Sequence, residues 1–85
     1  MSFQCTVVTP EQELLDLKVN QAIIPAIDGL IGILTDRAPL LARLGKGPLR
    51  IDPESGTSQT YNIEGGVAQM KDNKLTILTR KAAAV

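Results

Sequence analysis

The sequence predicts an all-β fold, a flattened β-sandwich or barrel of short strands in two stacked sheets. Apolar and polar residues alternate with a period of two along most of the chain, and turn-forming residues interrupt this alternation at short intervals. The chain has 85 residues, which suits one domain, and 44% of them are hydrophobic although only 2% are aromatic. We therefore expect one thin core that is filled mainly by aliphatic side chains.

The first third of the chain contains three predicted strands. Residues 3–9 alternate, and their inward face consists of Phe3, Cys5 and Val7. Residues 13–19 and 20–26 follow, and Pro25 marks an edge or a strand end in the second of them. Because Cys5 alternates with apolar neighbours, we interpret it as a small buried hydrophobe rather than a reactive thiol.

Residues 47–52 and 57–63 form the first predicted hairpin. Pro53 presets the backbone of the intervening turn and Gly56 tolerates a positive φ, so the two strands can pair. Ahead of this hairpin, residues 36–45 leave an alternative open. A polar first residue, a stripe of leucines and a terminal glycine would also suit a short helix.

Residues 67–71 and 75–79 form the second predicted hairpin, and Asp72-Asn73 between them tolerates the left-handed backbone of a tight turn. We place the domain at residues 1–80. We expect residues 81–85 to be a frayed tail, because their alanines favour a helix and nothing there is apolar enough to dock.

The composition excludes several kinds of chemistry. The chain has no histidine, which removes the commonest general base, the histidine-activated nucleophiles and most zinc sites. A single cysteine excludes an internal disulfide and paired-thiol redox chemistry, and fits a reducing compartment. Nine basic residues balance nine acidic ones, which argues against a nucleic-acid partner. We therefore expect no catalytic residue, no cofactor and no metal site.

Two glycine pairs superficially suggest phosphate loops. Gly45 and Lys46 lack the glycine five positions earlier, where Leu40 stands, and lack the hydroxyl residue that should follow the lysine. Gly29 and Gly32 lack the leading glycine of a dinucleotide-binding turn. Neither pair predicts a nucleotide site.

Three blocks of sequence, in order and at natural spacing, point to a known family. They read VVTPEQELLDLKV, then DGLIGILTDRAPLLARLGKGPLRI, then NIEGGVAQMKDNKLTIL. The chain closely resembles the epsilon subunit of F-type ATP synthase, specifically its N-terminal β-sandwich. The resemblance implies about ten strands in two sheets. Because the sequence stops just past the last predicted strand, we expect no C-terminal helical domain in this chain. It also implies a non-catalytic subunit at the foot of the central stalk, which binds the gamma subunit and the c-ring and couples ion-driven rotation to ATP synthesis.

The resemblance also implies which loops face the c-ring, although it does not indicate the face that binds gamma. The matching ring-facing residues here are Asp28, Gly29, Leu30, Ile31, Gly32, Asp36, Arg37 and Ala38. Leu30 stands where an acidic or polar residue is common in the family, and Arg37 stands where histidine is usual. Arg37 can supply a cation with five donors in place of an imidazole. Alternatively, Asp36 and Arg37 neutralise each other as a surface pair.

Many epsilon subunits continue into a two-helix hairpin that restrains ATP hydrolysis and in some members binds ATP. This chain stops at Val85, and we expect a naturally short subunit, with a trimmed longer chain as the alternative. The resemblance implies a peripheral location at the cytoplasmic face of the bacterial inner membrane, or an equivalent energy-coupling membrane, through the complex alone.

The residues alone are also compatible with two other functions. A β-sandwich of this size can serve as a free-standing adaptor, since a fold does not fix a function. Met70-Lys71 beside a predicted hairpin turn also suggests a biotinyl or lipoyl carrier using Lys71, although such carriers place the lysine near mid-chain.

Overall fold

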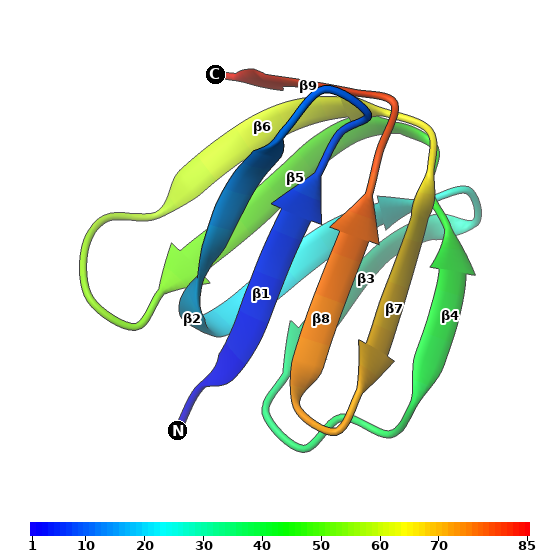
Figure 1. The fold of residues 1–85 in the computed structure, drawn as a ribbon. Coiled ribbons are helices and arrows are strands. Elements are labelled where there is room, and N and C mark those ends of the chain that lie inside the picture. The colour runs from blue at the N-terminus through cyan, green and yellow to red at the C-terminus, as the bar shows by residue number, and fades with distance from the viewer.

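The computed structural model describes residues 1–85 as nine β-strands with no helix (Figure 1). The strands are β1 (Phe3–Val8), β2 (Glu13–Ala26), β3 (Gly29–Leu34), β4 (Leu40–Arg43), β5 (Lys46–Pro53), β6 (Gln59–Glu64), β7 (Val67–Lys71), β8 (Lys74–Leu78) and β9 (Lys81–Ala84). The molecule measures 29 × 25 × 20 Å along its principal axes. None of its segments is a helix that could cross a membrane.

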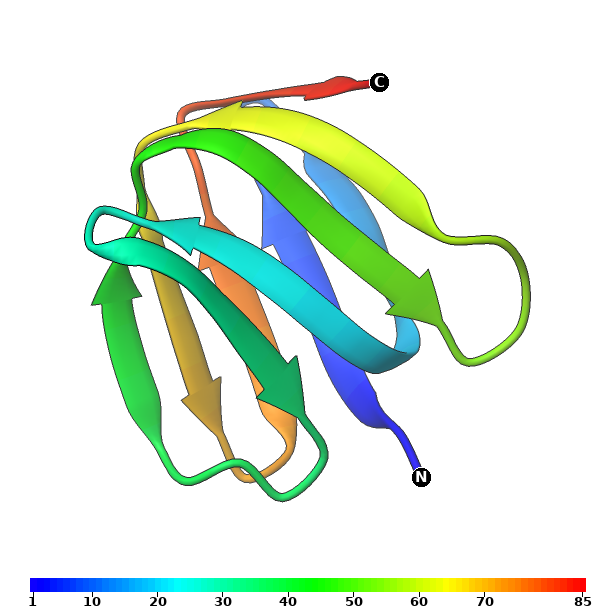
Figure 2. The same cartoon turned by 180° about the vertical axis from the view of Figure 1, so that it is seen from behind.

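The strands form two layers that share β2. One layer has the strand order β4-β7-β8-β1-β2, and the other continues from β2 through β5 and β6 to β9, with β3 on the free side of β2. Figure 1 shows the first layer in front, and Figure 2 shows the second layer from behind. Neighbouring strands are antiparallel except β1 and β8, which run parallel. The predicted all-β sandwich is confirmed.

The long strand β2 differs from the sequence prediction, which divided it into two strands. Its first part, up to Val19, pairs with β1, and its last part, Gln21–Ala26, pairs with β3. The register with β5 shifts between Val19 and Gln21, so the strand carries an irregularity there and continues into the other layer. The division at Asn20 was thus a bend within one strand.

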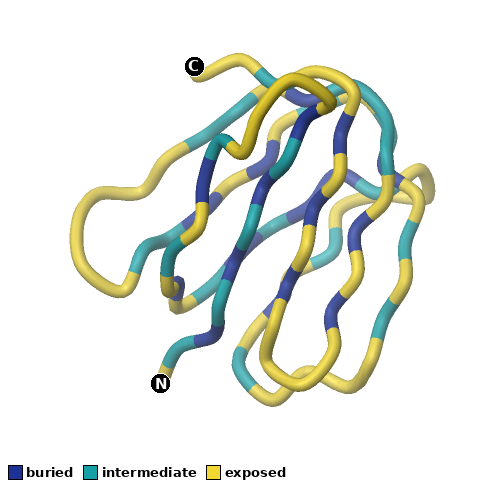
Figure 3. Tube along the Cα trace, viewed as in Figure 1, coloured by how far each residue is buried: buried dark blue, intermediate teal, exposed yellow.

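The core between the layers is aliphatic, as the composition predicts. Phe3, Cys5 and Val7 all point into it, and so do Leu49 and Ile51 of the first hairpin. Sixteen buried residues form one cluster, of which Phe3 is the sole aromatic member. Buried and exposed residues alternate along most strands (Figure 3), because successive side chains of a strand point to opposite faces.

Residues 81–85, expected as a frayed tail, instead include β9. This strand pairs with β6 in four registered positions, and the Val85 amide donates to the Thr60 carbonyl at 3.0 Å. Ala82 packs against the core. The expectation was wrong because it considered only apolar docking, whereas the open edge of β6 offers backbone hydrogen bonds that small residues satisfy well.

Residues 36–45 form no helix. Asp36 has a left-handed backbone with φ of 63°, and Leu40–Arg43 pair with β7 as strand β4. Leu40 and Ala42 are half-buried whereas Leu41 is 73% exposed, which is the alternation of a strand. The stripe of leucines therefore fits both periods, and pairing with β7 selects the strand.

Both predicted hairpins are present. Asp72 and Asn73 have φ of 51° and 57°, so both central residues of the β7–β8 turn are left-handed, as a two-residue turn requires.

The glycine pair Gly65-Gly66, just ahead of β7, carries the chain from one layer to the other. A Cβ at Gly66 would lie 2.0 Å from the Leu78 carbonyl oxygen, so this close approach excludes any side chain.

Candidate partner-binding site

The first predicted ring-facing segment is the tip of the β2–β3 hairpin. Ile27 and Asp28 form its turn, and Gly29 follows with φ of 128°, a conformation that favours glycine. The Ile27 amide donates to the Arg43 carbonyl at 3.0 Å, which ties the tip to the end of β4. Leu30 is 66% exposed and Ile27 is 57% exposed. The tip thus presents apolar side chains on a backbone that is held at its base.

Residues 29–32 belong to strand β3 rather than to a loop. Leu30 lies opposite Pro25 and Gly32 lies opposite Ile23 across the β2–β3 ladder. Gly32 has no left-handed backbone, and a Cβ there would meet no atom within 4 Å. Of the two glycines in this segment, Gly29 therefore has a backbone conformation that favours glycine, whereas Gly32 does not.

The second predicted segment is the exposed corner between β3 and β4, which contains Asp36, Arg37 and Ala38. The Arg37 amide donates to the Leu34 carbonyl at 3.3 Å. Asp36 and Arg37 form no ion pair. The single ion pair of the molecule joins Arg50 to Asp52. The alternative that Asp36 neutralises Arg37 is therefore wrong, and the Arg37 side chain offers an unpaired cation.

These two segments lie at opposite ends of β3, as Figure 2 shows. Six residues of strand span about 20 Å, so the hairpin tip and the Arg37 corner do not form one cluster. They are connected by the free edge of β3, which pairs with β2 alone.

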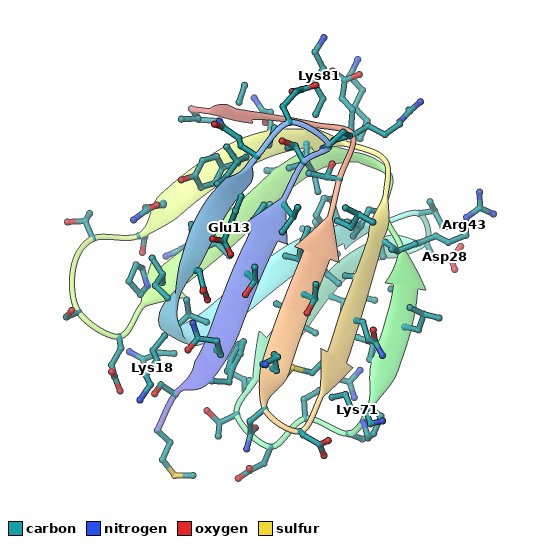
Figure 4. All side chains as sticks on the ribbon, viewed as in Figure 1. Glu13, Lys18, Asp28, Arg43, Lys71 and Lys81 are labelled. Atoms are coloured by element: carbon teal, nitrogen blue, oxygen red, sulfur yellow. The ribbon has the colours of Figure 1, made fainter.

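A shallow groove runs between β3 and β4 beside this edge. Its apolar lining includes Ile27, Leu30, Ile31, Leu40 and Leu41. Asp28 and Arg43 line the groove at the hairpin end, where Figure 4 shows both side chains reaching outward. Sequence reasoning missed the contribution of β4, although the exposed half of its alternation, Leu41, was a signal for it.

The titratable groups form no reactive centre. Burial, together with the Asp16 charge, raises the pKa of the Cys5 thiol to about 12, so the thiol stays neutral and inert. A hydrogen bond from Ser58 is the main cause of a lowered pKa at Asp52, and Arg50 adds to it from 3.1 Å. No three His, Cys, Asp or Glu side chains are close enough to hold a metal ion.

Lys71 lies at the end of β7, just before the turn and opposite Lys74 (Figure 4). Its side chain is exposed. The turn residues themselves are Asp72 and Asn73, so the lysine that was considered as a carrier site does not occupy the hairpin tip.

The sequence profile described as "ATP synthase, Delta/Epsilon chain, beta-sandwich domain" matches residues 2–85. The chain belongs to this family. Among delta/epsilon relatives, the ATP synthase epsilon chain of Rhodopirellula baltica is 41% identical over 85 residues, which cover all of this chain and 66% of that protein. The chloroplastic epsilon chain of Nephroselmis olivacea is 38% identical over 96% of this chain and 61% of that protein. The chain thus spans slightly less than two thirds of these curated relatives.

The delta/epsilon fold is also found in solved structures. A chain in the structure of the Euglena gracilis mitochondrial ATP synthase, which comprises OSCP, F1 and the c-ring, superposes with a TM-score of 0.91. It shares 25% sequence identity and the match covers 98% of this chain and 53% of that one. The resemblance inferred from the three sequence blocks is confirmed, and the carrier alternative is not retained.

Proposed function

We propose that this chain is the β-sandwich of a non-catalytic central-stalk subunit of an F-type ATP synthase, which helps to couple ion-driven rotation to ATP synthesis. The observation that carries this proposal is the family match over residues 2–85, which includes all nine strands. The absence of histidine and the neutral, buried thiol of Cys5 agree with a role in binding rather than in turnover.

The proposed partners are the gamma subunit and the c-ring. The Euglena structure to which the chain is similar contains F1 together with a c-ring. Through these partners the domain would lie at the cytoplasmic face of the bacterial inner membrane or at an equivalent energy-coupling membrane, without touching lipid itself.

We assign the ring contact to the β2–β3 tip, with Asp28, Gly29 and Leu30, and to the Arg37 corner. The tip supports this assignment because its apolar side chains are exposed and its backbone is held by the hydrogen bond from the Ile27 amide to the Arg43 carbonyl. The corner supports it because Arg37 is exposed and unpaired. Since the two segments are about 20 Å apart along β3, a partner that touches both must lie along the β3 edge.

The central experiment is co-purification of the chain with gamma and the c-ring. We expect Leu30→Glu and Arg37→Glu to reduce ring binding at least tenfold, because a buried unpaired carboxylate is costly. Arg80→Glu is the matched control, since Arg80 is also exposed, belongs to neither segment and follows the end of β8 that lies away from the β7–β8 turn. If the unaltered chain does not bind isolated gamma, the proposal is wrong and a free-standing adaptor is favoured.

A further inference from the structure

The Arg37 corner is fastened to the β7–β8 turn by a pair of reciprocal hydrogen bonds. The Asp36 amide donates to the Asn73 side-chain oxygen Oδ1 at 2.7 Å, and the Asn73 Nδ2 donates to the Asp36 carboxylate at 3.0 Å. The two residues are 37 positions apart in the sequence, and the two connections lie side by side in Figures 1 and 2. We call this pair the Asp36–Asn73 clasp.

Both members of the clasp have a left-handed backbone, with φ of 63° at Asp36 and 57° at Asn73. Among non-glycine residues, asparagine and aspartate tolerate this conformation best. At the second position of such a two-residue turn, however, glycine is the preferred residue. The turn alone therefore does not explain the asparagine, whereas the clasp uses both hydrogen-bonding ends of its amide.

Asn73 is itself anchored to the sheet. Its carbonyl accepts the amide of Gln4 at 3.0 Å, next to the first registered pair of β1 with β8. The corner it holds has only one other backbone hydrogen bond, from Arg37 to Leu34. The Asn73 side chain thus links the corner to the hydrogen-bonded β1–β8 part of the sheet.

We propose that Asn73 is a positioning residue, which orders the exposed corner and so presents Arg37 to the partner without touching the partner itself. The claim about presentation rests on the proposed function, whereas the claim about order does not. The two claims therefore need separate measurements.

The first measurement is the order of the corner in the chain alone. We expect Asn73→Gly to speed amide exchange at Asp36 about tenfold and to speed tryptic cleavage after Arg37, because it removes the clasp and keeps a left-handed turn. Asp72→Gly is the matched control, since it alters the same turn and leaves the clasp intact. Asp36→Asn should keep slow exchange, because its amide oxygen can still accept from Asn73. Unchanged exchange and cleavage in Asn73→Gly would overturn the proposal.

The second measurement is binding to the assembly of gamma and the c-ring. We expect Asn73→Gly to weaken binding in the unaltered chain and to have no further effect when Arg37 is already alanine, since coupled residues do not add. An equal loss in both backgrounds, or no loss in either, would overturn the positioning role. If the unaltered chain binds neither partner, the proposed function fails, and the exchange experiment still decides whether the clasp orders the corner.

Discussion

Replacing Gly66 with alanine should destabilise this domain strongly. Gly66 has φ of 115°, and a non-glycine residue there costs about 1–3 kcal/mol. The new Cβ would lie 2.0 Å from the Leu78 carbonyl oxygen and 2.7 Å from the Thr79 Cα, which are both backbone atoms, so the crossover must shift. That shift strains the bond from the Leu44 amide to the Gly66 carbonyl, now 2.8 Å, at about 1 kcal/mol. With the further loss of packing, the total is about 4 kcal/mol.

Gly56→Ala provides the matched control for this prediction. Gly56 has nearly the same φ, 114°, and a Cβ there meets nothing within 4 Å. We expect it to lose only the backbone component, about 1–3 kcal/mol. Urea unfolding followed by far-ultraviolet circular dichroism gives both free energies of unfolding. Equal losses in the two variants would refute the reasoning, whereas a Gly66→Ala chain that fails to fold beside a folded Gly56→Ala chain would support it.

Three further predictions test other parts of the fold. The pKa of Cys5 is about 12 in the folded chain, against an ordinary value of 9.0, so the unfolded chain releases this proton at a lower pH. The free energy of unfolding should therefore fall by up to about 1.4 kcal/mol per pH unit from pH 9 to 12. Cys5→Ala should lack that slope in alkaline urea titrations, and an identical slope would contradict it. Ser58→Ala should raise the pKa of Asp52 in a carboxyl NMR titration, because the Ser58 hydroxyl donates to that carboxylate at 2.6 Å; an unchanged pKa would assign the lowering to Arg50. Deleting residues 81–85 should lower the free energy of unfolding by about 2 kcal/mol and Tm by about 10 °C, since β6 loses its partner strand, and an unchanged Tm in calorimetry would mean that β9 contributes nothing.

Local patterns were sufficient to predict most of the fold. The alternation of Phe3, Cys5 and Val7 fixes which side of β1 is buried, and the left-handed tolerance of Asp72-Asn73 fixes a two-residue turn. These features depend only on neighbours in sequence, so they can be predicted without tertiary information.

The errors occurred where a distant strand decides the local structure. Residues 81–85 have no alternation of large apolar and polar side chains, and the open edge of β6 orders them. The segment at Leu40–Arg43 suits two periods, and β7 selects one. The separation of the hairpin tip from the Arg37 corner was also not predicted. The two segments are only a few residues apart in the sequence, and pairing of the intervening residues with β2 makes them the extended strand β3.

The shared strand β2 has a mechanical consequence. Its 14 residues are hydrogen-bonded to β1 in one layer and to β3 and β5 in the other. A sideways force on the β2–β3 tip therefore acts on the backbone hydrogen bonds of several strand pairs at once, in both layers. The hydrogen bonds of one strand pair cannot break without straining those of the others. A domain built in this way is expected to behave as a stiff lever under load, which transmits a push from its tip to its far side with little internal give.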